Sequence, residues 1–234
     1  MTEPKQHPLV SVIIPVFNGA RYIGEAIHSV LAQIYSNVEL IVIDDGSTDK
    51  TSGIVQSFGD RVRYQTQPNT GSGAARNRGV ELARAEFLTF LDADDLWLPD
   101  KLERQMAFFA EQPEIEAVSG MVEQFVSPEL SHQLPQPPEL SRPMPGAIPS
   151  AIAIRRQALA RVGEFATQWK VGEFADWYAR AVEAGLRLMM LPAIVARRRL
   201  HLDNQGVRHQ REVSAYAQIL KQSLDRRRAQ SEQG

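Results

Sequence analysis

The feature that most constrains the fold is an almost unbroken apolar run near the start of the chain, LVSVIIPV at 9–16. Such a β-branched run is typical of a central strand that is buried on both faces of a parallel sheet. Apolar residues then recur at helical spacing, at Ile23, Ile27, Val30 and Ile34. VELIVID at 38–44 predicts a second strand. Strand, helix and strand in this order indicate a right-handed crossover and a layered α/β sheet.

The same alternation continues along the chain. RVRYQT (61–66) and EFLTFL (86–91) predict two further strands, AIPSAIAI (147–154) a later one, and LRLMMLPAIVARRR (186–199) one or two short strands. Apolar stripes predict three more helices, at Leu98, Leu102, Met106 and Phe109, at Phe174, Trp177, Tyr178, Ala181 and Val182, and at Val213, Tyr216, Leu220 and Leu224. The segment 127–146 contains six prolines and predicts a loop.

Composition excludes several classes of protein. The 234 residues carry a formal net charge of −2, which argues against a large nucleic-acid interface. The sequence contains no cysteine, so disulfides and thiolate metal sites are excluded. No apolar run reaches the roughly 18 residues of a transmembrane helix. We therefore expect a soluble cytoplasmic protein without a transmembrane segment, whose membrane contact, if any, is peripheral.

Polar residues follow three of the predicted strands. Asn18, the pair Asp44 and Asp45, and the run from Asp92 through Asp94 to Asp95 all lie at strand ends. In open α/β sheets ligands bind at this carboxyl edge. Carboxylates this close favour a hard divalent cation with oxygen ligands, and such an ion can hold a diphosphate. The structural alternative is that Asp94 and Asp95 cap the helix that follows.

The glycine-rich segment GSGAARNRG at 71–79 does not predict a dinucleotide site. It lacks the G-x-G-x-x-G spacing and does not follow the first strand, and no Walker lysine is present. Arg76 and Arg78 lie on a helix entered from this loop, in reach of a phosphate or of the acidic edge. For Arg78 we favour simple exposure to solvent.

The residues resemble a known family. The segments SVIIPVFNGARYIGEAIHSVLAQIYSNVELIVIDDGSTDKT, NTGSGAARNRGV and FLTFLDADD look like family-2 glycosyltransferases of the GT-A fold, in that family's order and spacing. The resemblance is specific over about 9–120 and looser over 147–206. It implies a GT-A-type, Rossmann-like, mostly parallel mixed sheet flanked by helices, and inverting transfer of a sugar from a nucleotide-diphosphate donor with Mn²⁺ or Mg²⁺.

The resemblance also assigns roles to individual residues. The base and ribose pocket of the donor is expected at Pro15, Phe17 and Asp45, with Asn69 and Arg76 nearby and Asn18 at the same edge. Asp92 is expected to face the donor, and Asp94 the metal. Arg198 and His201, in ARRRLHLDN at 196–204, are expected to meet the diphosphate and the metal. The structural alternative for these last two is an edge strand with solvated arginines.

The general base departs from the family pattern. The resemblance implies a Glu-Asp pair at the start of a helix, and KVGEFADWYARAVEAG places Phe174 where the aspartate belongs. On a helical wheel Phe174 falls on the apolar face, so we expect Glu173 to be the base, ahead of Asp176. For Asp176 the alternative is a pair with Arg180 at i,i+4, and for Glu173 a carboxylate that stabilises the helix dipole.

We therefore predict a GT-A domain over 1–206, with a donor half at about 9–120 and an acceptor half at about 121–206, and a C-terminal helix and tail at 207–234. The helix is expected to pack on the domain, pair two subunits or touch an anionic membrane. The predicted function is transfer from a nucleotide-sugar, with UDP-sugars favoured, to a glycan, lipid-linked, peptide or small-molecule acceptor. A catalytically silent nucleotide-sugar-binding protein is the alternative.

Overall fold

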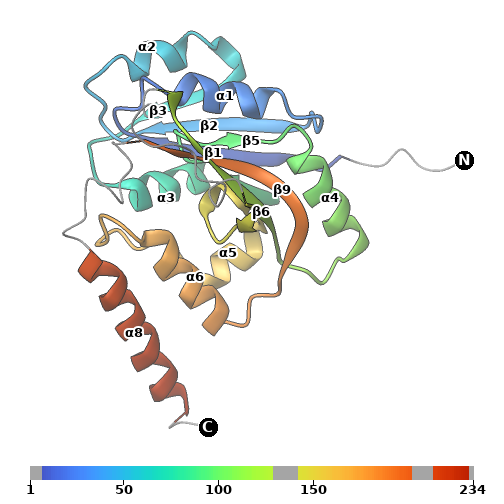
Figure 1. Cartoon of the computed structure of the whole chain (residues 1–234), viewed down its shortest axis with the longest axis vertical. Coiled ribbons are helices and arrows are strands. Elements are labelled where there is room, and N and C mark those ends of the chain that lie inside the picture. The colour runs from blue at the N-terminus through green and yellow to red at the C-terminus, as the bar shows by residue number, and fades with distance from the viewer. Residues whose placement is uncertain (1–6, 129–141, 202–212, 232–234) are drawn as a thin grey trace, which may run out of the picture.

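A computed structural model of the chain describes residues 7–128, 142–201 and 213–231, and it contains one mixed sheet flanked by helices (Figure 1). The strands are β1 Val10–Val16, β2 Val38–Asp44, β3 Arg63–Thr66, β4 Phe87–Phe90, β5 Leu96–Trp97, β6 Ala117–Val126, β7 Met144–Pro145, β8 Ala153–Arg155 and β9 Leu188–Leu200. The helices are α1 Ile23–Leu31, α2 Thr51–Gln56, α3 Ser72–Leu82, α4 Lys101–Glu111, α5 Arg156–Val162, α6 Glu173–Glu183 and α8 Val213–Ser231, with short 3₁₀ turns η1 Gly59–Arg61 and η3 Pro149–Ala151.

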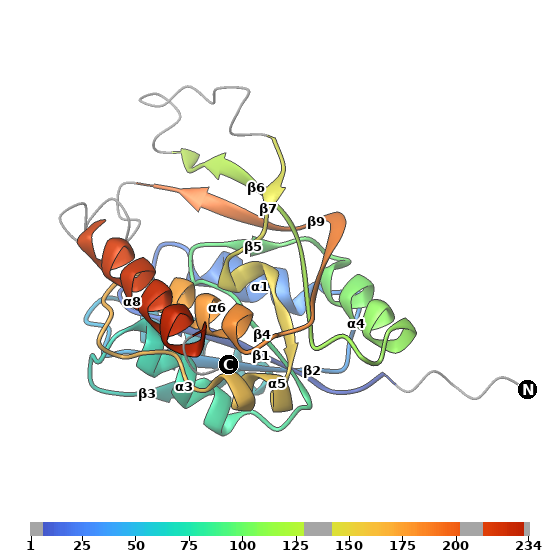
Figure 2. The same cartoon turned by 90° about the horizontal axis from the view of Figure 1, so that it is seen from below.

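The sheet order is β3-β2-β1-β4-β8-β6-β9-β5, and β7 pairs with β6. The strands β3, β2, β1 and β4 pair in parallel, β8 is antiparallel to both β4 and β6, and β9 runs parallel to β6. The expected mostly parallel mixed sheet is therefore confirmed. Figure 2 shows β6, β7 and β9 extending beyond the rest of the sheet.

Each face of the sheet has its own apolar cluster. Residues of α1, α2 and α4 pack with Val12, Ile14 and Val42 on one face, whereas α3, α5 and α6 pack with Ile13 and Ile41 on the other. The alternation of neighbouring β1 residues between the two clusters explains why the whole run is apolar. Gly79 of α3 lies so close to Ile13 that a Cβ has no room there, which holds α3 tightly against the central strand.

Several predicted details were wrong. Ile34 lies beyond the end of α1 and is 59% exposed. Within the predicted strand at 147–154 only the last two residues are in a strand, because Pro149 begins the turn η3 (Pro149–Ala151) and β8 starts only at Ala153. The predicted one or two short strands at 186–199 form a single strand, β9, whose register with β6 shifts twice. Of the segment 127–146, residues 129–141 lie outside the described part.

The C-terminal helix packs on α6, and its contact face differs from the predicted stripe. Ile219 is buried against α6, whereas Tyr216, Leu220 and Leu224 are about half exposed or more, at 50%, 61% and 45%. In the described ranges no helix combines the length and apolar character needed to cross a membrane.

One lysine is completely buried beneath the sheet. The Lys101 ammonium donates to Thr89 Oγ1 (3.1 Å) and Gln105 Oε1 (2.8 Å), and it lies 4.0 Å from the centre of the Trp97 ring. Among the described residues no carboxylate forms an ion pair with it. Burial therefore lowers the pKa of Lys101 well below its usual value.

This burial predicts a pH-dependent stability. Because the unfolded chain binds a proton at Lys101 more readily than the folded chain does, wild-type stability rises with pH between the lowered folded pKa and the unfolded pKa of about 10.4, by up to about 1.4 kcal/mol per pH unit. We expect wild type to gain stability relative to Lys101→Met when the free energy of unfolding in urea is measured at increasing pH between neutral and alkaline values. Parallel pH dependences of the two proteins would contradict this account.

Candidate active site

The predicted polar edge exists. Asp44 ends β2, Asp45 follows it and Asp92 follows β4, and both strands pair in parallel with β1. Parallel strands bring their carboxyl ends to the same edge. The ends of β2 and β4 therefore bring the carboxylates of Asp44, Asp45 and Asp92 to one edge of the sheet.

Asp45 holds the loop that leads into α3. Its Oδ1 accepts hydrogen bonds from the Thr70 backbone N–H (2.9 Å) and from Gln67 Nε2 (2.8 Å), and its Oδ2 accepts one from the Gly71 N–H (2.7 Å). Gly71 has φ of 98°, which a residue with a side chain rarely adopts. The loop geometry fixes where α3 begins, and hence where Arg76 projects.

Arg76 is the centre of the site. Its side chain is buried, with its Nη2 2.6 Å from Asp92 Oδ1 and its Nη1 in an ion pair with Glu173 Oε1. Ser72, one turn earlier on α3, donates its hydroxyl to the same Glu173 oxygen at 2.7 Å. One guanidinium therefore links β4, α3 and the first residue of α6.

Burial and these contacts shift the pKa values of the two carboxylates in opposite directions. Burial alone would raise the pKa of Glu173, but Arg76 and Ser72 hold it below its ordinary value. Burial raises the pKa of Asp92, with Asp94 and Glu173 adding to the shift and Arg76 opposing it. Although burial favours the neutral form of Arg76, the two carboxylates raise its pKa. Glu173 is therefore the carboxylate that Arg76 keeps ionised.

Asp94 and His201 meet at the same edge. His201 Nε2 lies 2.9 Å from Asp94 Oδ2, and the His201 ring packs on Tyr22 with 4.7 Å between ring centres. The two residues come together because β5, just after the aspartates, pairs antiparallel with β9 at Leu96–Arg197 and Trp97–Ala196.

Asp95 plays a structural part. It is 3% exposed, and it accepts hydrogen bonds from the Ser150 hydroxyl (2.7 Å) and from the Arg199 backbone N–H (3.0 Å). Burial raises its pKa well above the usual value, and Asp94 and Asp92 raise it further. It ties the loop at 91–95 between β4 and β5, the aspartate loop, to β9.

The side chains present fit a divalent ion that shares its ligands with a phosphate. Within the described residues no group of three or more His, Asp or Glu is placed to hold a metal ion. Asp94 and His201 lie together as a carboxylate and an imidazole, two groups able to ligate such an ion. Mg²⁺ bound with substrate phosphates commonly uses only one or two carboxylates from the protein.

The residues expected to bind the nucleobase and ribose of the donor lie at the end of β1 and nearby. Pro15 is buried within β1, whereas the Phe17 ring is 47% exposed. Asn18 adopts φ of 51° and is locked to the next loop, donating its N–H to Ser47 Oγ (2.8 Å) and accepting from the Thr48 N–H at its Oδ1 (2.8 Å). Asn69 is exposed.

The two base candidates lie in different surroundings. Glu173 faces Arg76 in the centre of the site, whereas Asp176 Oδ2 accepts a hydrogen bond from Arg180 Nε at 2.9 Å. The contact of Asp176 is the i,i+4 pair of the structural alternative. Phe174 is buried beside Trp177 and Tyr178, as its place on the helical wheel predicts.

Sequence reasoning missed Arg199. Its Nε donates to the Asp94 carbonyl (2.9 Å) and its Nη2 lies 2.7 Å from Glu25 Oε2, so it braces the aspartate loop. Arg198, which was expected to meet the diphosphate, is half-buried opposite Gln124 and makes no hydrogen bond or ion pair among the described residues. Residues two apart in a strand share a face, so the expected role of His201 already indicated that Arg199 lies on the same side.

The link through Arg76 predicts a large effect on stability. Replacing one partner of a buried ion pair leaves the other charges uncompensated, at a cost of about 3–5 kcal/mol. We therefore expect Arg76→Met to lower the free energy of unfolding by this order at neutral pH. The loss should shrink as pH falls below the ordinary glutamate pKa of about 4.3 towards the lowered folded pKa of Glu173, because that carboxylate then becomes protonated and its stabilisation by Arg76 is lost in wild type as well.

The matched control is Arg78→Met on the same helix. Arg78 pairs with Glu81 at 2.6 Å on the surface, with 45% of its side chain exposed, and should cost less than about 1 kcal/mol. Equal losses in the two variants, or a loss for Arg76→Met that does not vary with pH, would contradict the central role of Arg76.

Comparison with known proteins places this geometry in context. An uncharacterized glycosyltransferase of Rickettsia typhi is 48% identical over 106 residues, which are 45% of this chain and 33% of that protein. One of Haemophilus influenzae is 47% identical over 105 residues, covering 43% of this chain and 42% of that protein. The chain thus spans less than half the length of these curated relatives.

Solved structures agree on the fold. The crystal structure of Staphylococcus aureus TarS 1-349 is similar over 81% of this chain and 60% of that chain, with a TM-score of 0.66 and 23% identity. The complex of the same protein with UDP-GlcNAc gives a TM-score of 0.67 and 21% identity over 82% of this chain and 58% of that chain. The family model of glycosyl transferase family 2 matches residues 11–163. The chain belongs to glycosyl transferase family 2.

Proposed function

We propose that the chain is an inverting glycosyltransferase that moves a sugar from a nucleoside diphosphate, with a UDP-sugar as donor, to a hydroxyl-bearing acceptor. The observation that carries this proposal is that two charged clusters lie at the carboxyl edge of the sheet: Asp92 and Glu173 on the buried Arg76, and Asp94 paired with His201. Family membership and the capture of UDP and UDP-GlcNAc by TarS support it.

On the donor side, the exposed ring of Phe17 offers a surface for the uracil, and Pro15, Asn18, Asp45 and Asn69 form its surroundings. Aromatic rings bind nucleobases through their faces. Because Asp45 is held by the Gly71 loop, it would recognise the donor only together with that loop.

The diphosphate would lie between the aspartate loop and the end of β9. Asp94 and His201 would hold Mn²⁺ or Mg²⁺, and Arg198, which has no internal ion pair in the described residues, would bind phosphate oxygens. When bound, the divalent ion supplies positive charge beside the departing diphosphate. Asp92, held by its ion pair with Arg76, would face the sugar.

In the chemical step, the acceptor oxygen forms a bond to the anomeric carbon as the bond from that carbon to the diphosphate breaks. The acceptor's proton passes to a carboxylate and the electron pair leaves with the nucleoside diphosphate. Glu173 is our candidate base, because its two side-chain contacts with Ser72 and Arg76 both use Oε1. Asp176, bound to Arg180, is the second candidate.

A second function, that of a catalytically silent nucleotide-sugar-binding protein, is favoured by two observations. Phe174 occupies the position where the family resemblance places an aspartate, and its ring is buried. Glu173 is paired with Arg76 and has a lowered pKa, which weakens it as a base at neutral pH. Binding of the donor without turnover is the behaviour expected of such a protein.

The acceptor half, at about 121–206, would select among glycan, lipid-linked, peptide and small-molecule acceptors. The UDP-GlcNAc complex of TarS makes N-acetylhexosaminyl transfer the first class to test, ahead of hexosyl transfer.

The assignment of the base predicts a clear difference between two variants. With UDP-GlcNAc and UDP-glucose as donors, Mn²⁺ and a panel of acceptors, release of UDP should fall on the order of 100-fold in kcat for Glu173→Gln. Asp176→Asn should stay within a few-fold of wild type, because its carboxylate lies outside the site. UDP binding should persist in both variants.

A larger loss in Asp176→Asn than in Glu173→Gln would reverse the assignment. Donor binding by wild type without any turnover across the panel would favour the silent protein. Failure of a folded wild-type protein to bind any nucleotide-sugar would contradict both functions.

A further inference from the structure

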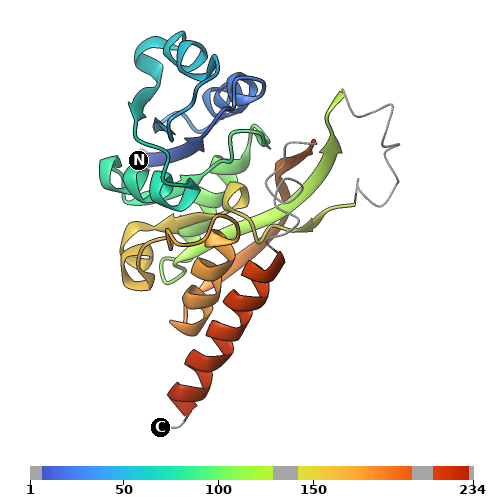
Figure 3. The ribbon, with the colours of Figure 1, turned by 90° about the vertical axis from the view of Figure 1, so that its left-hand side faces the viewer.

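We propose that the C-terminal helix α8 is a positioning element of the active site, which holds α6 so that Glu173 meets Arg76. This inference rests on the proposed function for its catalytic consequence. Figure 3 shows α8 as a long helix beside α6, on the side away from the sheet. The residues of α8 involved are Ile219, Ser223 and Arg226, which contact Gly172 and Glu183 at the two ends of α6.

The first point of contact is the residue directly before Glu173. Gly172 caps the start of α6 with φ of 89°, and a Cβ placed on it would lie 2.9 Å from Ile219 Cδ1 and 3.4 Å from Tyr216 Cε1. Its carbonyl accepts the first-turn hydrogen bond of α6, from the Asp176 N–H at 2.9 Å. Ile219, which is 4% exposed, therefore packs directly on the backbone turn that aims Glu173.

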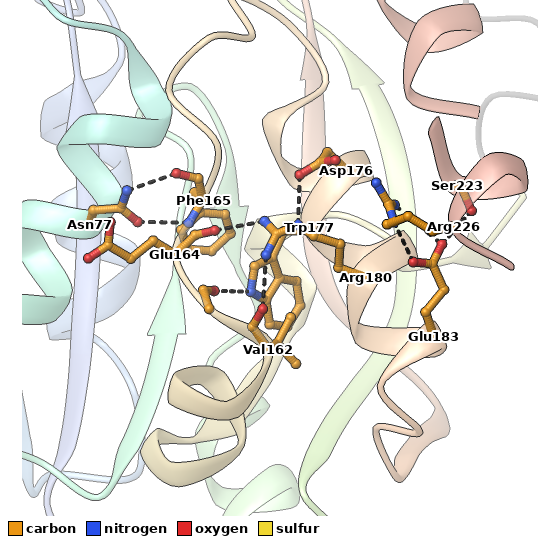
Figure 4. Close-up of polar contacts among 11 residues, drawn as sticks. Asn77, Val162, Glu164, Phe165, Asp176, Trp177, Arg180, Glu183, Ser223 and Arg226 are labelled. Atoms are coloured by element: carbon orange, nitrogen blue, oxygen red, sulfur yellow. Dashed lines mark hydrogen bonds and ion pairs between the residues drawn. The ribbon is translucent and has the colours of Figure 1, made fainter. Parts of the chain in front are cut away.

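The second point of contact is the last residue of the same helix. Glu183 accepts hydrogen bonds from the Ser223 hydroxyl and from Arg226 Nε, both at 2.6 Å (Figure 4). Burial alone would raise the pKa of Glu183, but Arg226 and Ser223 hold it below its ordinary value. Contacts with α8 hold α6 at both ends, at Gly172 and at Glu183, and therefore fix its position along its own axis.

On its other side α6 is tied to the helix that carries Arg76. Arg180 donates to the carbonyls of Val162 (2.9 Å) and Glu164 (2.7 Å), and Asn77 of α3 exchanges two hydrogen bonds with the Phe165 backbone, at 2.8 and 2.9 Å (Figure 4). A continuous series of contacts therefore runs from α8 through α6 and this connecting segment to α3. Asn77 follows Arg76 directly in the sequence.

A small shift of α6 would displace Glu173 relative to Arg76 more than it displaces any other residue of the site. Glu173 reaches Arg76 from the first position of α6, whereas Asp92 reaches it from the end of a central strand. Loosening α8 should therefore affect the base and the chemical step more than the donor-binding loops at the ends of β1 and β2. This distinguishes positioning from a general contribution to folding.

The test uses the full chain with Ile219→Ala, which removes the packing on Gly172. Hydrogen exchange of the amides at 173–176 should become at least about 10-fold faster. For transfer or hydrolysis of the sugar donor, kcat should fall on the order of 10-fold while KM for the donor stays within about 2-fold. Ile219→Val should restore both values, and Leu224→Ala, a 45% exposed position of the same helix, should leave them unchanged.

Three results would overturn the inference. These are unchanged exchange at 173–176, faster exchange spread evenly over the whole core together with a lower Tm, and local exchange that accelerates in an active enzyme without loss of kcat. If Ile219→Ala does not fold, Arg226→Ala provides the same readouts at the other contact. If wild type shows no turnover, local exchange still decides the positioning role, and the failure belongs to the proposed function.

Discussion

The arrangement of the site depends on one buried cation. Arg76 is 3% exposed, and it is neutralised by Asp92 from the end of β4 and by Glu173 from the start of α6, 81 residues further along the chain. Leaving Arg76 or Glu173 without its partner would bury an uncompensated charge, which costs several kcal/mol. The sheet, α3 and α6 must therefore pack in an arrangement that brings Arg76, Asp92 and Glu173 together. This arrangement determines the shape of the acidic edge.

This constraint bears directly on the chemistry proposed for the family member described here. Arg76 keeps Glu173 ionised and correctly aimed, and both conditions serve a base, but the same ion pair lowers its proton affinity. Phe174 beside it fills apolar space instead of contributing the carboxylate that the family resemblance implies. In the proposed reaction, turnover would thus depend on how the donor and acceptor change the surroundings of Glu173. The packing of α8 matters for the same reason, because it limits how far α6 can move.

The sequence predicted much of the fold because its signals are local. Strands buried on both faces must be apolar throughout, and the polar cluster after 86–91 marks where a strand leaves the core. Predictions failed where the outcome depends on distant partners. The contact face of α8 is set by Gly172 and Glu183 of α6, which no periodicity within α8 encodes. In the same way, the bond between Arg199 and the aspartate loop exists only because β5 pairs with β9.

The central claim, that this edge is the donor site, is tested most directly by calorimetric titration of UDP with Mn²⁺ and with chelator, into wild type and Asp94→Asn. The account predicts binding of UDP by wild type that requires Mn²⁺ and is lost or strongly weakened in Asp94→Asn. Binding of UDP with equal affinity to both proteins, or in the presence of chelator, would contradict the assignment of Asp94 and His201 as metal ligands. No binding to a folded wild-type protein would contradict the donor site itself.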